Sequence, residues 1–132
     1  MILVDTNVPM YLVGNDDRLK DRAARLLDQA VHNRDRLVTD AEVFQEILHR
    51  YAAIDRREAI QPAFDLLHTI ADEIFPITVS AIESAKTLVL GYHRLSARDA
   101  LHAAVMQEHS IEWIMSFDRG FDDIPGLRRL AN

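Results

Sequence analysis

Cysteine is absent from this chain of 132 residues, and glycine and proline are scarce, with four of each. The lack of cysteine excludes disulfides, thiolate metal ligands and thiol nucleophiles. It also fits a reducing compartment, so we expect a cytoplasmic location. No apolar run approaches the roughly 18 residues that a membrane-spanning helix needs. The first residues have no basic region before their short apolar run, so we expect neither a signal peptide nor a membrane anchor.

Positive charge is also in short supply, because 15 Lys and Arg residues face 21 Asp and Glu residues and the net charge is −6. A protein that coats nucleic acid through bulk charge would have the opposite sign. A nuclease with an acidic metal site is compatible with this balance, since bound cations offset its carboxylates locally. Hydrophobic residues make up 48% of the chain and no linker or repeat interrupts it, so we expect a single domain over residues 1–132.

Short apolar runs alternate with amphipathic stretches along the sequence. The runs predict strands at 1–4, 37–39, 74–77 and 113–116, and the ending at 127–130 is compatible with a fifth. Helices are predicted at 8–13, 18–33, 41–53, 55–71, 79–92 and 96–107. Pro62 is expected to break or kink the fourth helix, and Pro76 to place the third strand at an edge or a strand end. This alternation implies an α/β fold with a mostly parallel sheet of four to five strands, flanked by helices.

Four acids stand where such a fold brings them to one edge of the sheet: Asp5, Glu46, Asp99 and Asp118. Asp5 and Asp118 directly follow predicted strands, Asp99 lies in the first turn of a helix, and Glu46 lies beside the apolar stripe of another. In open α/β sheets, ligands bind outside the carboxyl ends of the strands. The four positions therefore predict a carboxylate cup for a divalent metal.

Each acid, taken alone, also has an ordinary structural explanation. The two acids that follow strands suit Asx turns or helix caps. Asp99 comes three residues after Ser96, which gives a variant of the capping box. Glu46 and Arg50 have the i, i+4 order of a surface ion pair. These alternatives stay open for the single residues, and the convergence of all four on one edge favours the metal site.

Two neighbouring residues have predicted roles as well. Asp40 follows the second predicted strand and is expected to cap the helix that starts at residue 41. His102 lies one turn after Asp99, and we expect it to pack or to form a hydrogen bond rather than to bind metal, since Mg²⁺ prefers oxygen ligands.

The segments around these acids resemble a known family. The resemblance is carried by MILVDTN at 1–7, EVFQEI at 42–47, SARDALHAA at 96–104 and IMSFDRGFD at 114–122. Together they resemble a PIN domain, and in its size and ending the chain resembles a VapC-type toxin of bacterial toxin–antitoxin pairs. The DTN start and the S-x-R-D-A-x-H-A-A segment are the more specific pieces.

The resemblance implies a Mg²⁺- or Mn²⁺-dependent endoribonuclease whose metal-binding acids are Asp5, Glu46, Asp99 and Asp118. It implies supporting roles for Thr6, Ser116 and Asp122. As partners it implies an RNA substrate, a second copy of the chain in a homodimer, and a small cognate antitoxin of the VapB type. The chain differs from many relatives in having serine rather than threonine at 116, and from some in having Gly120 in place of a further acid.

Hydrolysis of a phosphodiester needs an aimed water and cations that hold the developing negative charge. We expect Asp5 to be the central ligand, the two later aspartates to be further ligands, and Glu46 to hold a water of the metal. Arg98 and Arg119, each next to one of the acids, are candidate phosphate contacts, although most surface arginines are simply solvated.

Two alternatives belong to other functional classes. The first is a phosphatase or phosphotransferase with an aspartyl nucleophile at Asp5. Such sites commonly have a second acid two residues later, where this chain has Asn7. The second is a non-catalytic binding module in which the acids are caps and the apolar helices between residues 41 and 71 dock a partner. Metal-dependent cleavage of RNA would separate the nuclease from both.

Overall fold

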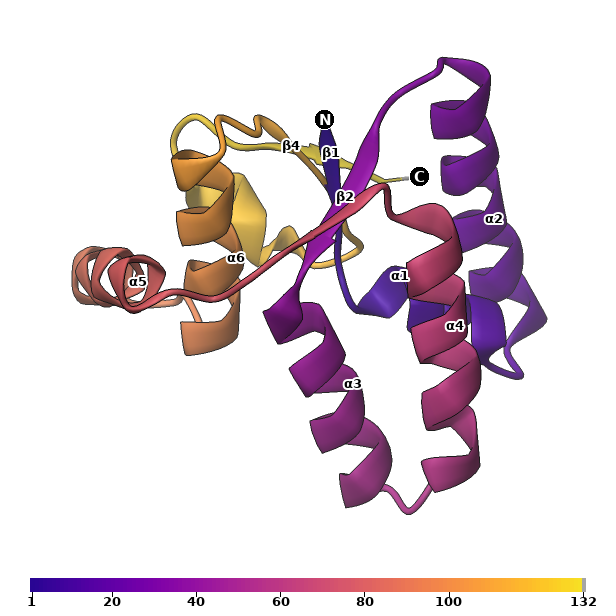
Figure 1. The fold of residues 1–132 in the computed structure, drawn as a ribbon. Helices are drawn as coiled ribbons and strands as arrows, with labels where there is room; N and C mark the ends of the chain where they lie inside the picture. Colours follow the sequence, from indigo (N-terminus) through magenta and orange to yellow (C-terminus); the bar gives the residue numbers. More distant parts are fainter. Residues whose placement is uncertain (132) are drawn as a thin grey trace.

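Five parallel strands form the centre of the protein in a computed structural model, which describes residues 1–131 (Figure 1). The strands are β1 (Ile2–Val4), β2 (Leu37–Asp40), β3 (Glu73–Phe75), β4 (Trp113–Met115) and β5 (Arg128–Leu130). They lie in the order β3-β2-β1-β4-β5, and every pairing is parallel. The predicted α/β fold is thus confirmed, with the fifth strand present. Asn132 lies outside the described residues.

Helices join the strands in the predicted order. Between β1 and β2 lie α1 (Asn7–Val13) and α2 (Asp17–His32). Between β2 and β3 lie α3 (Ala41–Ala53), the 3-10 turn η1 (Arg57–Ala59) and α4 (Ile60–Ile70). The chain then forms α5 (Val79–Gly91) and α6 (Ala97–Glu108) before β4, and the 3-10 turn η2 (Arg119–Asp123) before β5.

The predicted helix at 55–71 is shorter than expected, and proline explains where it begins. The α-helical part starts at Ile60, so Pro62 lies in the first turn of α4. Amide groups of the first turn have no partner within a helix, so the missing N–H of proline costs nothing there. Pro62 therefore lies near the start of α4 instead of breaking a longer helix. Pro76 follows β3, and the prediction that this strand lies at an edge is confirmed by the strand order.

Alternate residues of the strands pack on opposite faces of the sheet, as the pleat requires. Leu3 and Ile114 join the core under α5 and α6. Val4 and Met115 join a second core with α2 and the start of α1. A third apolar cluster holds α3 and α4 together, and these two helices extend beyond the sheet as an antiparallel pair (Figure 1).

The carboxyl ends of β1, β2 and β4 meet at one edge because the strands are parallel and in register. Leu3 pairs with both Val38 and Ile114. Asp5 follows β1 and Ser116 follows β4, so residues far apart in the sequence become neighbours at this edge. None of the helices in the described part of the chain has the length and apolar character needed to cross a membrane.

Candidate active site

A cavity of about 460 Å³ opens at the carboxyl edge of the sheet. We call it the acidic cavity, because all four predicted acids line it: Asp5, Glu46, Asp99 and Asp118. They come from four separate places in the fold: the residue after β1, α3, the first turn of α6 and the segment between β4 and η2. The structure therefore brings the predicted cup together, although the role of each acid as a metal ligand stays a prediction.

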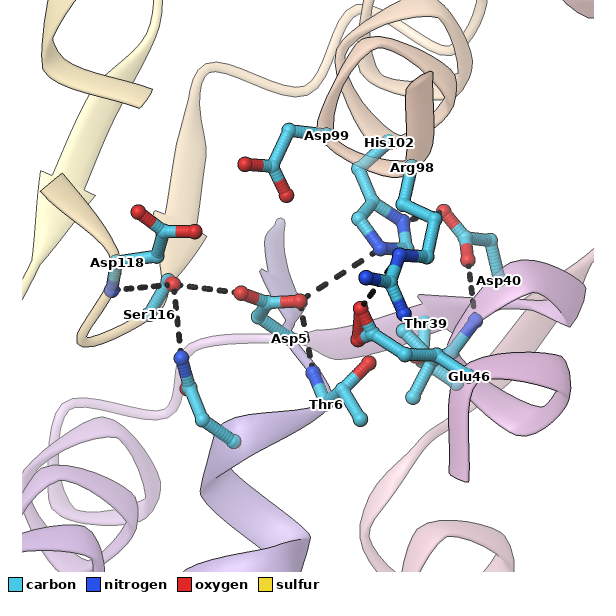
Figure 2. A network of polar contacts seen from close by, with 12 residues as sticks. Asp5, Thr6, Thr39, Asp40, Glu46, Arg98, Asp99, His102, Ser116 and Asp118 are labelled. Atoms are coloured by element: carbon cyan, nitrogen blue, oxygen red, sulfur yellow. Dashed lines mark hydrogen bonds and ion pairs between the residues drawn. The ribbon is translucent and has the colours of Figure 1, made fainter. Parts of the chain in front are cut away.

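Asp5 is the buried floor of the acidic cavity, with 4% of its surface exposed. One carboxylate oxygen accepts the backbone N–H of Thr6 at 2.8 Å, and the other accepts the hydroxyl of Ser116 at 2.6 Å (Figure 2). Ser116 in turn accepts the backbone N–H of Asp118 at 3.0 Å. Burial raises the pKa of Asp5 above its ordinary value, and the two hydrogen bonds act against that rise. Both oxygens of Asp5 thus have a fixed direction.

A buried histidine lies behind Asp5. His102 Nδ1 is 2.7 Å from Asp40 Oδ2, and its Nε2 is 3.6 Å from Asp5 Oδ1 (Figure 2). Burial disfavours the imidazolium, but the negative charges of Asp40 and Asp5 outweigh it and raise the pKa of His102 to about 10. The expected hydrogen-bonding role of His102 is confirmed.

Asp40 has two roles, of which the sequence indicated only one. Its side chain accepts the backbone N–H of Val43 at 3.0 Å, so the predicted cap of α3 is confirmed. The same fully buried carboxylate also pairs with His102, which lies 62 residues later. No local sequence pattern predicts that contact, because it arises where α6 packs over the end of β2.

Glu46 is held by an arginine from another helix. Its Oε1 lies 3.5 Å from Arg98 Nε (Figure 2), and the residue is only 9% exposed. The alternative in which Glu46 pairs with Arg50 is wrong, since the Arg50 guanidinium is placed 4.0 Å from the sulfur of Met10. Arg98, predicted to contact phosphate, therefore fixes Glu46 at the side of the acidic cavity.

Asp99 lies among other carboxylates. The Ser96 hydroxyl accepts its backbone N–H at 3.1 Å, which confirms the predicted cap, while its carboxylate points toward the space between Asp5 and Asp118 (Figure 2). Partial burial, together with the negative charges of Asp5 and Asp118, raises the pKa of Asp99 to about 7. The positive charge of His102 lowers the pKa of Asp99 too little to offset these effects.

Gly120 leaves the gap between two of the acids open. A Cβ atom at this position would lie 3.2 Å from Asp118 Oδ1 and 3.4 Å from Asp99 Oδ2. The Asp118 carboxylate instead accepts the backbone N–H of Gly120 at 2.8 Å, which is the turn chemistry expected for it. Any side chain at position 120 would project directly between the carboxylates.

The predicted supporting residues divide into two groups. Thr6 and Ser116 both contact Asp5, and the buried Thr6 hydroxyl has no hydrogen-bond partner within residues 1–131. Asp122 instead forms two hydrogen bonds with Arg129, at 2.8 and 3.0 Å, and is not among the residues that line the acidic cavity.

Some lining residues of the acidic cavity were not predicted as site residues, among them Arg50 and Arg94, whereas Asn7 was expected to be either a neighbour that orients Asp5 or a turn residue. Asn7 links the start of α1 to the segment after β4, because its amide donates to Ser116 Oγ at 3.4 Å and its oxygen accepts the Phe117 N–H at 3.3 Å. Arg50 could have been predicted to line the cavity, because it lies one turn after Glu46 on the same helical face. Arg94 lies in the loop before α6, and nothing in its local sequence indicated the cavity.

The donor set suits a hard divalent cation, because the four acids offer only oxygen ligands. As they stand, however, no three carboxylate or imidazole side chains in residues 1–131 are close enough together to hold a metal ion. Carboxylates without a cation repel one another, as the raised pKa of Asp99 indicates. Mg²⁺ commonly takes one or two carboxylates and keeps several waters. The geometry therefore fits an ion held partly through water better than direct ligation by all four acids.

Known proteins share this sequence and fold. A sequence model of the PIN domain matches residues 2–127. Ribonuclease VapC13 of Mycobacterium tuberculosis is 60% identical over 131 residues, which cover 99% of this chain and 100% of that protein. The crystal structure of M. tuberculosis VapC20, described as a toxin that cleaves the sarcin–ricin loop, aligns with a TM-score of 0.75 at 23% identity, over 89% of this chain and 90% of that one. A toxin–antitoxin complex from Klebsiella pneumoniae aligns with a TM-score of 0.67 at 22% identity, over 97% and 96%. These two structures establish a likeness of fold.

Proposed function

The chain belongs to the PIN-domain family, and from this premise we propose that it is a toxin of the VapC type, an endoribonuclease that hydrolyses RNA phosphodiesters at the acidic cavity with Mg²⁺ or Mn²⁺. The observation that carries the proposal is the meeting of four carboxylates from four places in the fold in one cavity. Its further support is a relative named as a ribonuclease that aligns over almost the whole chain.

The buried acids explain how the cavity would hold its cation. Hydrolysis adds negative charge to the phosphoryl oxygens, and a bound divalent cation would neutralise that charge and promote deprotonation of water. Asp5, Asp99 and Asp118 are the residues that would hold it. Asp5 is best placed as the central ligand, because hydrogen bonds from Thr6 and Ser116 fix its carboxylate before any ligand arrives.

Glu46 has a different part in this proposal. Arg98 lies 3.5 Å from its carboxylate, so Glu46 already has a cationic neighbour and is better suited to orient a water by hydrogen bonding than to bind the metal directly. Arg50 and Arg94 line the same cavity, and they are the arginines that would contact an incoming phosphate.

The phosphatase alternative is weaker on geometric grounds. Both oxygens of Asp5 accept hydrogen bonds and the residue is buried, which disfavours it as a nucleophile. Position 7 holds an amide engaged with β4 in place of a second acid. The binding-module alternative does not explain why Asp99 lies among other acids that raise its pKa.

The same proposal includes partners and a location. We expect a VapB-like antitoxin to hold the ribonuclease inactive, a homodimer as the working form, and a cytoplasmic location, where RNA is found. The Klebsiella toxin–antitoxin complex supports the antitoxin, because one of its chains shares the fold of this chain over nearly its full length.

Mapping of RNA ends tests the proposed activity. Purified protein is incubated with a mixed RNA pool in Mg²⁺, Mn²⁺ or a chelator, with Asp99→Asn as the matched control. New internal ends are expected only for the wild type and only with metal. Equal cleavage in the chelator, or release of inorganic phosphate without internal cuts, would contradict the proposal, and the second result would favour the phosphatase.

A further inference from the structure

A second cavity, of about 490 Å³, adjoins the acidic cavity. Tyr11 and Phe117 line both cavities, so they form a shared wall. The two rings contact each other, with their centroids 5.1 Å apart and their planes tilted by 42°. Both side chains are only partly buried, since they cover the core beneath them and leave aromatic surface at the wall.

The second cavity is lined by three arginines from three elements, and we call it the basic cavity. Arg22 comes from α2, Arg119 from η2 and Arg129 from β5. This concentration contrasts with the net charge of −6 of the whole chain. A positive cavity directly beside a negative one makes a site that favours an anion on one side and a cation on the other.

Two of these arginines are held in place by the protein. The Arg22 guanidinium lies over the Phe117 ring, 5.1 Å from its centroid. Arg129 donates two hydrogen bonds to Asp122 and a third, at 3.2 Å, to the carbonyl oxygen of Ser116. The pairing with Asp122 raises the pKa of Arg129 above its already high value, so it stays charged.

Arg119 differs from the other two. It is exposed, and within residues 1–131 its side chain forms no hydrogen bond or ion pair, although its charge helps to lower the pKa of Asp122. It directly follows Asp118, an acid of the acidic cavity, yet its side chain lines the basic cavity. Asp118, which caps η2, and Arg119, which begins it, thus lie on the two sides of the aromatic wall.

The chemistry of the two cavities matches two consecutive phosphates of one strand. We propose that the basic cavity binds the phosphate next to the scissile phosphodiester of a single-stranded RNA, with Arg119 as its principal contact. Guanidinium groups bind phosphate oxygens in a bidentate manner, and aromatic side chains accept nucleobases by stacking or edge contact. Between the cavities the strand passes over Tyr11 and Phe117. A single strand can place its bases on these rings because it has no base pairs to break. This inference rests on the proposed ribonuclease function.

Binding measurements on the intact protein test the basic cavity without requiring cleavage. A fluorescent single-stranded RNA is titrated in chelator, and anisotropy is read at several salt concentrations. For Arg119→Ala we expect Kd to rise about tenfold, since a hydrogen-bonded charge contact is lost. The slope of log K against log salt should fall by about 0.7, the value for one phosphate contact on a single strand.

Two further variants keep the test specific. Arg119→Lys retains the charge and should keep the salt slope while recovering only part of the affinity, because lysine cannot make the bidentate contact. Arg57→Ala removes an exposed arginine of η1 that lines neither cavity, and it should bind as the wild type does. Thermal melts of all variants check that each is folded.

The possible failures separate the two proposals. If the wild type cuts RNA with metal but Arg119→Ala keeps the wild-type Kd and salt slope, the basic cavity is not a phosphate subsite and the ribonuclease proposal stands. If the wild type cuts no RNA but binds it in an Arg119-dependent way, the ribonuclease proposal fails, and the basic cavity stands as a phosphate-binding site but not as one next to a scissile bond. Equal Arg119-dependent affinity for a duplex of the same sequence would overturn the assignment to a single strand.

Discussion

Asp40 and Asp99 are acids at the same edge of the sheet, each at the start of a helix, but their surroundings are opposite. Asp40 is fully buried and has His102 at 2.7 Å and the Val43 N–H at 3.0 Å. Asp99 has Asp5 and Asp118 as neighbours, and its pKa is raised to about 7. An acid that is paired with a buried cation is costly to remove, whereas an acid placed among acids destabilises the structure until a cation arrives from solution.

Replacement of Asp40 by Asn should produce the largest loss of stability. Asp40→Asn leaves His102 buried without its carboxylate, and we expect the free energy of unfolding at pH 7 to fall by about 3 kcal/mol. Urea denaturation measures this change. Asp28→Asn, on the exposed face of α2, is the matched control and should stay within about 0.5 kcal/mol of the wild type. Equal stability of the two variants would show that removal of Asp40 from its buried pair with His102 is not costly.

The same substitution at Asp99 should act in the opposite direction on stability. Asp99→Asn removes one of the crowded charges, so we expect the apo protein to gain about 1 kcal/mol, a value discounted for the partial exposure of the group. RNA cleavage should fall by about 100-fold or more, since even residues that only support metal ligands cost about 10- to 100-fold when replaced. Initial cleavage rates and thermal melts in chelator measure the two effects. A variant that melts lower than the wild type, or that keeps full activity, would contradict a shared acidic site.

Addition of metal should reverse the instability that the acidic cavity causes. At ten times its Kd, Mn²⁺ or Mg²⁺ should stabilise the wild type by about 1.4 kcal/mol, because it binds only the folded state. Asp99→Asn should show a smaller gain at the same concentration, since it has lost one carboxylate. Thermal unfolding midpoints over a metal titration give both values. An identical gain in the two proteins would show that Asp99 takes no part in binding.

The dependence of stability on pH tests the same comparison, and its expected effect is the smallest. The pKa of Asp99 is about 7 in the folded state and 3.8 in the unfolded state, so the folded state retains a proton over that interval. In chelator, stability should therefore fall as pH rises from 4 to 7, by about 1 kcal/mol after allowance for solvent exposure. Asp99→Asn should flatten this part of the curve.

Titration of His102 should lower the stability further at higher pH. Its pKa is raised from 6.5 to about 10, so its stabilising contribution is complete below pH 6.5 and is lost as pH rises toward 10. Denaturant unfolding across the pH range checks both intervals. A wild-type stability that increases between pH 4 and 7 in chelator would contradict the assignment for Asp99.

The elements were predictable because their signals are local. Short apolar runs give the strands, and the side chains of Asp40 and Ser96 cap the helices that follow them, as expected. Parallel strands place their carboxyl ends at one edge, so the convergence of Asp5, Asp99 and Asp118 followed from the order of elements alone.

The partners of these acids were not predictable, because they come from contacts between distant elements. Local spacing gave Glu46 a partner on its own helix, and packing of α6 against α3 gave it Arg98 instead. His102 was expected to find some hydrogen bond, but its partner Asp40 is 62 residues away. The family resemblance grouped Asp122 with the acidic site, but Arg129 of β5 binds it instead.

The hydrogen bond from Ser116 to Asp5 joins residues 111 positions apart. During translation β1 leaves the ribosome long before β4, so Asp5 at first lacks the hydroxyl of Ser116. Asp118, the last acid of the acidic cavity to be made, follows Ser116. A nascent chain therefore carries no assembled cup. The acidic cavity is complete only when synthesis is almost finished.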